Sequence, residues 1–291
     1  MAHPAQVDGR WLVIGHRGML GTDLMAVLHD RDVVGLDLPD IDITDAASVD
    51  HAVNGFDIVV NCAAYTAVDA AEDNEAIAFA VNAVGPENIA RACARTGAWM
   101  THISTDYVFD GTATTPYPED APMAPNTAYG RTKAAGEQAV RAVHSDRSHI
   151  LRTAWLYGAH GPNFVRTMIA LEQQRDSLEV VSDQHGQPTW SHDLATRLTL
   201  ALVRGVPAGT FHATSSGATT WYDFTQRIFT MLGADPERVL PTTTDKFPRP
   251  APRPAYSVLG HDAWARHGLR PMRDWNSALE AAWPSLTTPE S

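Results

Sequence analysis

Residues 11–21, Trp-Leu-Val-Ile-Gly-His-Arg-Gly-Met-Leu-Gly, determine the fold expected for this chain. Four apolar residues are typical of a short buried strand, and the glycines at 15, 18 and 21 form a G-x-x-G-x-x-G loop that leads into a helix. Glycine tolerates a positive φ and lets a phosphate approach the backbone, and a helix N-terminus offers free N–H groups. The stretch therefore favours a site for a dinucleotide diphosphate, although three glycines can also mark a plain tight turn.

Short apolar runs alternate with longer amphipathic runs from this loop to about residue 155. Such alternation predicts strands connected by helices in a parallel sheet, where strands are buried on both faces. The fold class expected is α/β: a Rossmann-like, doubly wound parallel sheet with a smaller mixed α/β C-terminal substrate domain. We expect strands at 11–14, 33–36, 58–61, 99–103 and 149–154, and helices at 20–28, 76–84 and 88–94 around Pro86, and 128–143.

The alternation loosens after residue 155, which suggests a dinucleotide-binding domain over 1–155 and a mainly substrate-binding domain over 156–291. Later segments could thread back into the first domain. The stretch 241–254 holds five prolines and is predicted to be an extended surface arm, because proline disfavours helices and central strands. The other elements predicted here are helices at 163–174, 192–203, 221–232 and 275–283, a short helix near 261–267, and a strand at 178–181.

Composition excludes several classes of function. The 22 basic and 34 acidic residues give 22 − 34 = −12, which is unfavourable for non-specific binding of nucleic acid. Cys62 and Cys93 lie in apolar stretches and are expected to be reduced core thiols. The first ten residues lack the apolar core of a signal peptide, and no run approaches the ~20 apolar residues that span a bilayer. We expect a cytoplasmic protein that binds neither nucleic acid nor membrane.

Asp37 ends the second predicted strand, sixteen residues after Gly21. This is close to the spacing of ~20 residues at which a carboxylate accepts hydrogen bonds from the adenosine ribose, and it favours NAD. Arg17 in the loop could meet a 2′-phosphate, so NADP stays open, and either charge could instead be a solvated surface group. Further cofactor contacts are predicted at Asp42 and Ile43 beside the adenine and at Ala63, Ala64 and Tyr65 after the third strand.

Tyr129 and Lys133 are four residues apart in a predicted helix, a spacing that places both side chains on one face. An ammonium group near a phenol favours its ionised form, so we expect Lys133 to lower the pKa of Tyr129 and make it a general acid. Thr105 ends the fourth strand, where ligands gather in such sheets, and would hydrogen-bond the same substrate oxygen. Together the three side chains would polarise a ketone. An isolated Tyr-x-x-x-Lys pair is usually structural, and the prediction depends on its conjunction with the glycine loop and Asp37.

These motifs resemble the extended short-chain dehydrogenase/reductase superfamily, and two longer ones resemble its dTDP-4-dehydrorhamnose reductase family. The two are Asn61-Cys-Ala-Ala-Tyr-Thr-Ala-Val-Asp-Ala-Ala-Glu72 and Ser104-Thr-Asp-Tyr-Val-Phe-Asp-Gly111. The likeness extends through 152–158, 183–189 and 253–259. It implies reduction of dTDP-4-dehydro-6-deoxy-L-mannose to dTDP-L-rhamnose with NADPH or NADH, the last step of synthesis of a cell-envelope sugar donor.

The resemblance also implies roles for individual residues. Tyr129 would donate the proton, Lys133 would lower its pKa and hold the nicotinamide ribose, and Thr105 would tune the carbonyl. Family positions that touch the sugar correspond to Val68, Asp106 and Trp155. The cofactor set carried over is Gly15, Arg17, Gly18, Met19, Leu20, Asp37, Asp42, Ile43, Ala63, Ala64 and Tyr65, with Tyr129 and Lys133.

One departure from the family concerns magnesium. Some members dimerise through a magnesium ion held by glutamates; Asp23 stands at the first such position, but no glutamate stands at the second, near 192–193. We therefore expect no metal site, no requirement for magnesium, and a monomer or weak homodimer. The cluster of His185, His192 and Asp193 lacks a known ligand spacing and is better explained as a polar loop.

Other functions and contacts stay open. A 4,6-dehydratase would carry a glutamate after the Thr-Asp pair, where this chain has Tyr107, and an epimerase would cause no net oxidation of coenzyme. A catalytically silent regulatory subunit is the alternative from another class. Trp155 could be a core aromatic rather than a substrate contact. Arg249 and Arg253 on the proline-rich arm could be solubilising charges, or Arg253 could clamp the substrate diphosphate.

Overall fold

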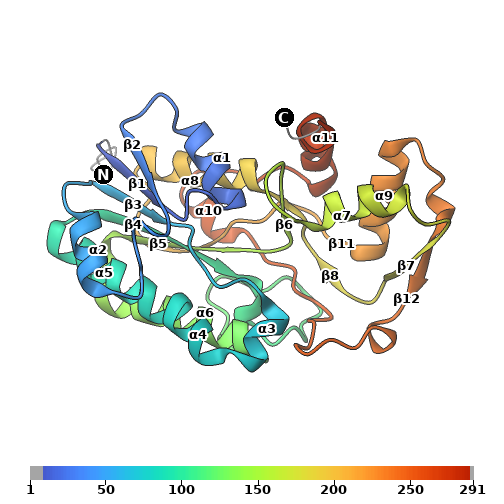
Figure 1. Cartoon of the computed structure of the whole chain (residues 1–291), viewed down its shortest axis with the longest axis horizontal. Helices are drawn as coiled ribbons and strands as arrows, with labels where there is room; N and C mark the ends of the chain where they lie inside the picture. Colours follow the sequence, from blue (N-terminus) through green and yellow to red (C-terminus); the bar gives the residue numbers. More distant parts are fainter. Residues whose placement is uncertain (1–8, 289–291) are drawn as a thin grey trace.

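Six parallel strands form the main sheet in the computed structural model, which describes residues 9–288 (Figure 1). Their order across the sheet is β10-β5-β4-β3-β1-β2. The five strands predicted in the first half are confirmed, each within two residues of its expected ends. The strands are β1 (Trp11–Ile14), β2 (Val33–Leu36), β3 (Ile58–Asn61), β4 (Trp99–Thr105), β5 (Ser148–Thr153) and β10 (Gly209–His212).

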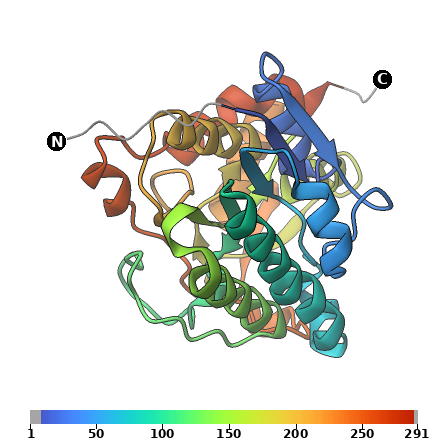
Figure 2. The same cartoon turned by 90° about the vertical axis from the view of Figure 1, so that its left-hand side faces the viewer.

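Helices cover both faces of this sheet (Figures 1 and 2). Successive side chains of a strand point to opposite faces, so Trp11 and Val13 of β1 enter one core cluster and Leu12 and Ile14 enter the other. The first cluster is covered by α1 (Met19–Val27), α8 (Ser191–Val203) and α10 (Asp262–Arg266), and the second by α2 (Ala46–Val53), α5 (Gly85–Thr96) and α6 (Ala128–His144).

The helical region before β4 is continuous through Pro86. It consists of α3 (Val68–Asp73), α4 (Glu75–Phe79), a π-helical turn (Ala80–Val84) and α5. Pro86 lies in the first turn of α5, directly after the π-helical turn, and it cannot donate the backbone hydrogen bond that a continuous helix makes to the turn before it. Helix α2 was not predicted. It begins after Asp45, whose side chain accepts a hydrogen bond from the Ala47 N–H.

The second half of the chain contributes to the main sheet. Strand β10 pairs in parallel with β5, and α8 packs on α1. The indole of Trp264 in α10 is buried and donates a hydrogen bond to the His212 carbonyl oxygen at 2.7 Å. These contacts place 191–212 and 262–266 with the residues of the first half. No helix within 9–288 has the length and apolar content needed to cross a bilayer.

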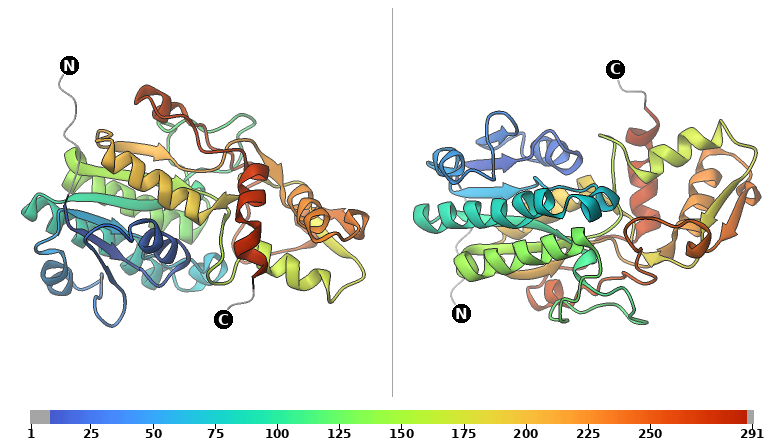
Figure 3. Two further views of the ribbon diagram at one scale, coloured as in Figure 1. Left: turned by 90° about the horizontal axis from the view of Figure 1, so that it is seen from above. Right: turned by 60° about the horizontal axis from the view of Figure 1, so that its bottom comes forward.

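The remaining elements form a smaller mixed region beside the sheet (Figure 3). Its core contains Tyr157, Phe224 and Leu279. Pro241 belongs to an edge strand, so the predicted arm starts later, at 243; the strand has a single neighbour, which tolerates the missing N–H. The paired strands are β6 (Leu156–Tyr157) with β9 (Thr189–Trp190), β7 (Leu178–Val181) with β12 (Val239–Thr242), and β8 (His185–Gly186) with β11 (Thr219–Thr220); the helices are α7 (Phe164–Glu172), α9 (Trp221–Leu232) and α11 (Trp275–Thr287).

Candidate active site

The glycine loop joins β1 to α1 at the point where the strand order reverses between β1 and β3. Gly15 has φ +80°, and a Cβ there would lie 2.7 Å from the backbone nitrogen of Ala63. A Cβ at Gly21 would overlap the carbonyl oxygen of Gly15. Only glycine therefore fits these two positions. The loop presents its backbone and the first turn of α1 to a cavity, which is where parallel α/β sheets bind nucleotides.

This cavity has a volume of about 720 Å³, within the range of small-molecule sites. Tyr65 is not among its lining residues: the Asn82 side chain binds both the N–H and the carbonyl of Tyr65, whose ring packs beside Tyr129 against small alanines. The predicted cofactor residues that do line the cavity are Gly15, Arg17, Gly18, Met19, Leu20, Asp37, Asp42, Ile43, Ala63 and Ala64.

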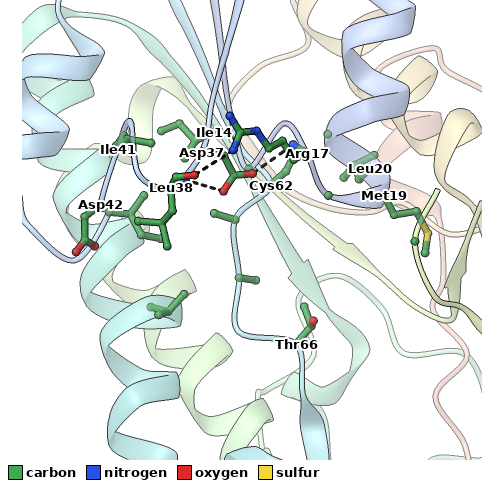
Figure 4. Close-up of a pocket in the computed structure, with 18 of the residues that line it drawn as sticks. Ile14, Arg17, Met19, Leu20, Asp37, Leu38, Ile41, Asp42, Cys62 and Thr66 are labelled. Atoms are coloured by element: carbon green, nitrogen blue, oxygen red, sulfur yellow. Dashed lines mark hydrogen bonds between the residues drawn. The ribbon is translucent and has the colours of Figure 1, made fainter.

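Asp37 is held in place at the end of β2 (Figure 4). Its two carboxylate oxygens accept hydrogen bonds from the Arg17 N–H at 3.2 Å and the Leu38 N–H at 3.0 Å. The exposed Arg17 guanidinium donates to the Leu38 carbonyl oxygen and lies 3.8 Å from Asp40. One carboxylate and one guanidinium thus lie at the same edge of the cavity.

A second cavity, of about 340 Å³, lies at the carboxyl ends of β4 and β5. It shares Cys62, Ala64, Thr66 and Leu156 with the larger cavity, so the two adjoin. The structure brings the predicted catalytic residues and most of the predicted sugar contacts together here: Val68, Thr105, Asp106, Tyr129, Lys133 and Trp155.

Tyr129 and Lys133 lie in the first turns of α6, which begins after Thr127; the Thr127 hydroxyl accepts a hydrogen bond from the Gly130 N–H. Lys133 Nζ donates to the Ile103 carbonyl oxygen at 2.6 Å. Burial lowers the pKa of Lys133 to about 8, against the opposing charge of Glu137. The pKa of Tyr129 was expected to be lowered; instead burial raises it to about 12, although a hydrogen bond from Thr105 acts in the other direction.

Asp106 carries an unpaired oxygen in this cavity. Its Oδ1 accepts a hydrogen bond from the Thr105 hydroxyl at 2.9 Å, while its buried Oδ2 makes no hydrogen bond of normal geometry among the described residues. The Ser257 hydroxyl lies close enough to Asp106 to lower the pKa of its carboxyl. Burial raises the pKa of Asp106 to about 6 despite the nearby hydroxyl donors. A buried acceptor without a partner is costly, and a sugar hydroxyl would satisfy it.

A buried ion pair connects the elements that carry the catalytic residues, β4, β5 and α6. Arg152 of β5 donates two hydrogen bonds of 2.8 Å to Glu137 of α6, and the Ser104 hydroxyl of β4 donates a third at 2.6 Å. Both charged side chains are almost fully buried. Removing Glu137 would leave Arg152 as an uncompensated charge in the core, whereas Glu137 is also paired with Arg141 of α6. The Arg152–Glu137 pair and the Ser104 hydrogen bond tie α6 to β5 and β4.

A third cavity, of about 500 Å³, opens beyond the catalytic one and shares Tyr107 and Trp155 with it. Trp155 has φ +48°, a conformation that costs a bulky residue about 1–3 kcal/mol and clusters at functional sites. Arg253, predicted to meet the diphosphate, lines this cavity and donates to Asp69 Oδ2 at 2.9 Å. Asp69 lies in α3, so this contact joins the arm to the first half of the chain.

Tyr107 and Trp221 are among the lining residues that the sequence analysis missed. Tyr107 borders the catalytic and the outer cavity, and its ring packs edge-on against Tyr129 with centroids 5.5 Å apart. Its position directly after Thr105 and Asp106 was a usable signal. Trp221 lines the outer cavity from the start of α9, and no local pattern distinguishes it from a core aromatic.

A doubly wound sheet with a glycine loop after its first strand and a Thr-Tyr-Lys set in the adjoining cavity defines a reductase of the short-chain dehydrogenase/reductase class. The family model described as "RmlD substrate binding domain" matches residues 9–287. The chain belongs to the dTDP-4-dehydrorhamnose reductase family, as its motifs predicted.

Individual relatives span nearly the whole chain. A dTDP-4-dehydrorhamnose reductase of Streptomyces griseus is 52% identical, covering 95% of this chain and 94% of its own length. A dTDP-4-keto-6-deoxy-D-glucose reductase of Streptomyces niveus is 50% identical, covering 97% and 99%. The crystal structure of the dTDP-4-dehydrorhamnose reductase of Bacillus anthracis in complex with NADP is 37% identical, with a TM-score of 0.91 over 95% of this chain and 99% of that one.

Proposed function

We propose that this protein reduces the 4-keto group of dTDP-4-dehydro-6-deoxy-L-mannose to form dTDP-L-rhamnose, with NADH or NADPH as reductant. The observation that carries the proposal is that Thr105, Tyr129 and Lys133 line one cavity, which adjoins the glycine-loop cavity. The choice of substrate is supported by 52% identity, over nearly the full length, to a relative named dTDP-4-dehydrorhamnose reductase.

The residues of the larger cavity fit a nicotinamide dinucleotide. The close approaches at Gly15 and Gly21 leave backbone N–H groups free of side-chain cover for a diphosphate, and the Asp37 carboxylate lies where it would accept hydrogen bonds from the ribose hydroxyls. Asp42 and Ile43 line the end assigned to the adenine. The relative crystallised with NADP shows that a protein of this fold accommodates such a group.

The coenzyme, when bound, supplies a hydride to the carbonyl carbon of the sugar. Tyr129 donates its proton to the carbonyl oxygen, which becomes the new hydroxyl group. With substrate bound, the Thr105 hydroxyl turns its proton from Asp106 Oδ1 to the same carbonyl oxygen and stabilises the negative charge that develops there. Lys133, protonated below its pKa of about 8, stabilises the tyrosinate that remains after transfer.

The substrate would extend from the catalytic cavity into the outer one. Val68, Asp106 and Trp155 border the sugar, and the unpaired Asp106 Oδ2 accepts a hydrogen bond from one of its hydroxyl groups. The outer cavity offers aromatic rings for the base, and Arg253 is positioned at its lining to bind the diphosphate. We expect a monomer or weak homodimer and no role for magnesium.

A second candidate substrate is dTDP-4-keto-6-deoxy-D-glucose, because a relative named for its reduction is 50% identical to this chain. The test is to incubate the purified protein with each 4-keto sugar nucleotide and to follow oxidation of NADH and NADPH, with EDTA present and absent. Faster turnover of the L-sugar with dTDP-L-rhamnose as product supports the proposal. Faster turnover of the D-sugar selects the second candidate. Absence of coenzyme oxidation with both would point to an epimerase, a dehydratase or a silent subunit.

A further inference from the structure

Two stacked tryptophans lie where the catalytic cavity meets the outer cavity. The ring centroids of Trp155 and Trp221 are 3.5 Å apart and their planes differ by 6°. Trp155 lines both cavities, whereas Trp221 lines the outer one alone. Trp155 is thus part of the wall between the two cavities, and Trp221 covers one face of its indole. Trp221 does not line the catalytic cavity itself.

Two segments distant in the sequence, around Gly186 and Trp221, hold the Trp155 ring. Trp155 has φ +48°, so its conformation depends on its surroundings. A Cβ at Gly186 would lie 2.5 Å from Cζ2 of Trp155, so the indole needs a glycine there. Gly186 pairs with Thr219 in the strand pair β8–β11, and β11 leads directly into Trp221. The same strand pair thus carries both surfaces against which the ring packs.

The Trp221 side chain is itself well anchored. It lies at the first position of α9, which Thr220 caps by accepting a hydrogen bond from the Asp223 N–H at 3.0 Å. Phe164 of α7 packs on it with ring centroids 4.3 Å apart. The Trp155 and Trp221 rings lie face to face in van der Waals contact, so a fixed Trp221 restrains Trp155.

We propose that Trp221 is a positioning residue of the reductase: it holds the Trp155 indole as the wall that orients the keto sugar toward Thr105 and Tyr129. The inference rests on the proposed reduction of a 4-keto sugar nucleotide. Its physical basis is that proton transfer needs close alignment, and displacement of a wall by about 1 Å can cost up to ~100-fold in rate.

The test compares Trp221→Phe, which keeps an aromatic face for stacking, with Trp221→Leu, which does not. We expect Trp221→Leu to lower kcat by about tenfold or more, and Trp221→Phe to restore it to within about threefold of the wild type. The dissociation constants of NADH and NADPH, measured by fluorescence, should not change. If Trp221 only lined the outer cavity, its substitution would raise KM for the sugar nucleotide and leave kcat unchanged. That result would overturn the inference.

Two further variants keep the test decisive if Trp221→Leu does not fold. Gly186→Ala intrudes on the Trp155 ring and leaves Trp221 in place, and it should lower kcat in the same way. Trp283→Leu, in α11 and outside both cavities, is the matched control and should leave kcat unchanged. Unchanged kcat in Gly186→Ala together with Trp221→Leu would reject the positioning role.

Circular dichroism of the protein without substrate tests whether Trp155 and Trp221 stack in solution. Two indoles stacked face to face couple and give adjacent bands of opposite sign, which Trp155→Phe and Trp221→Phe should each abolish and Trp283→Leu should retain. Wild-type protein without this signal would overturn the inference while leaving the proposed function intact. Wild-type protein that shows the signal but reduces neither sugar would reject the proposed function, and the inference would fall with it.

Discussion

Tyr129 keeps its proton throughout the physiological pH range in the free protein, because burial raises its pKa to about 12. A proton donor must carry its proton before the reaction, so this shift suits its proposed role. The neighbouring Lys133, with a pKa of about 8, loses its charge first as the pH rises. Its charge, rather than the ionisation of Tyr129, would then limit activity on the alkaline side.

Replacement of Tyr129 tests the donor directly. Tyr129→Phe keeps the ring that packs against Tyr107 and removes only the hydroxyl, so we expect kcat to fall by ~10²–10⁴-fold. Binding of NADH and NADPH, measured by fluorescence titration, should stay within about twofold. Tyr107→Phe is the control within the same ring pair, and a similar loss of kcat there would mean that the wrong phenol has been assigned.

Asp106 should destabilise the protein near neutral pH. Its pKa is about 6 in the folded state against 3.8 in the unfolded chain, so the folded state binds the proton more tightly. The stability that this provides is complete below pH ~4 and is lost as the pH rises to ~6. Asp106→Asn should therefore gain stability over wild type between pH 4 and pH 7, by up to about 3 kcal/mol, in urea unfolding experiments.

The neighbouring carboxylate provides a control of opposite sign for the Asp106 experiment. The hydrogen bond from Tyr117 lowers the pKa of the partly exposed Asp110, so this carboxylate stabilises the fold above its unfolded pKa and Asp110→Asn should be less stable than the wild type over the same range. Equal pH dependence in Asp106→Asn and wild type would show that the buried carboxyl does not titrate as proposed. Reduced activity of Asp106→Asn at every pH would accompany its role as a sugar contact.

At the scale of elements, local patterns predicted β1 to β5, β7 and the long helices, whereas the short strands β6, β8, β9 and β11 and the strands β10 and β12 were missed. The segment 11–27 combines a buried strand, a glycine loop and an amphipathic helix, and each of these follows from contacts within a few residues. Helix α2 and strand β10 escaped prediction. Both elements are short and partly polar. Strand β10 forms because it pairs with the edge of β5, and no local sequence pattern indicates that pairing.

The end of β2 should set the preference between coenzymes. The two backbone hydrogen bonds fix the Asp37 carboxylate where a 2′-phosphate would meet it, so we expect tighter binding of NADH than of NADPH. Asp37→Asn should shift the ratio of the two dissociation constants toward NADPH by about tenfold. Asp32→Asn, at the opposite end of the same strand, should leave the ratio unchanged. If the wild type binds NADPH more tightly, Arg17 rather than Asp37 determines the coenzyme preference.

At the scale of the whole molecule, the site combines residues that local sequence could and could not reveal. Motifs at strand ends predicted the glycine loop, Thr105 and Tyr129, because the carboxyl ends of parallel strands meet at one edge. Trp221 and the partner of Arg253 could not be predicted, since both depend on how the second half of the chain packs over the first.

One carboxylate joins the proline-rich arm to the first half of the chain. Asp69 accepts a hydrogen bond from Arg253, lies 3.9 Å from Arg249, and accepts the Ala251 N–H at 3.3 Å. Asp69→Asn should raise KM for the sugar nucleotide by about three- to tenfold, because Arg253 would lose its fixed position; stability should fall by at most ~1 kcal/mol, as the pair is partly exposed.

The control for this arm contact is Asp73→Asn, an exposed carboxylate of the same helix, which should leave KM and unfolding midpoints unchanged. An unchanged KM in Asp69→Asn would mean that Arg253 does not bind the substrate in the position that Asp69 gives it.

The place of β10 has a consequence for how the chain acquires its shape on the ribosome. Until residues 209–212 have left the exit tunnel, β5 has an open edge, and the apolar side chains that α8 later covers face water. A nascent chain of 155 residues therefore resembles an unfinished sheet, exposed to pairing with its neighbours. A fragment ending at residue 155 should accordingly sediment as aggregate when expressed alone, and adding 156–291 as a separate polypeptide during synthesis should return part of it to solution.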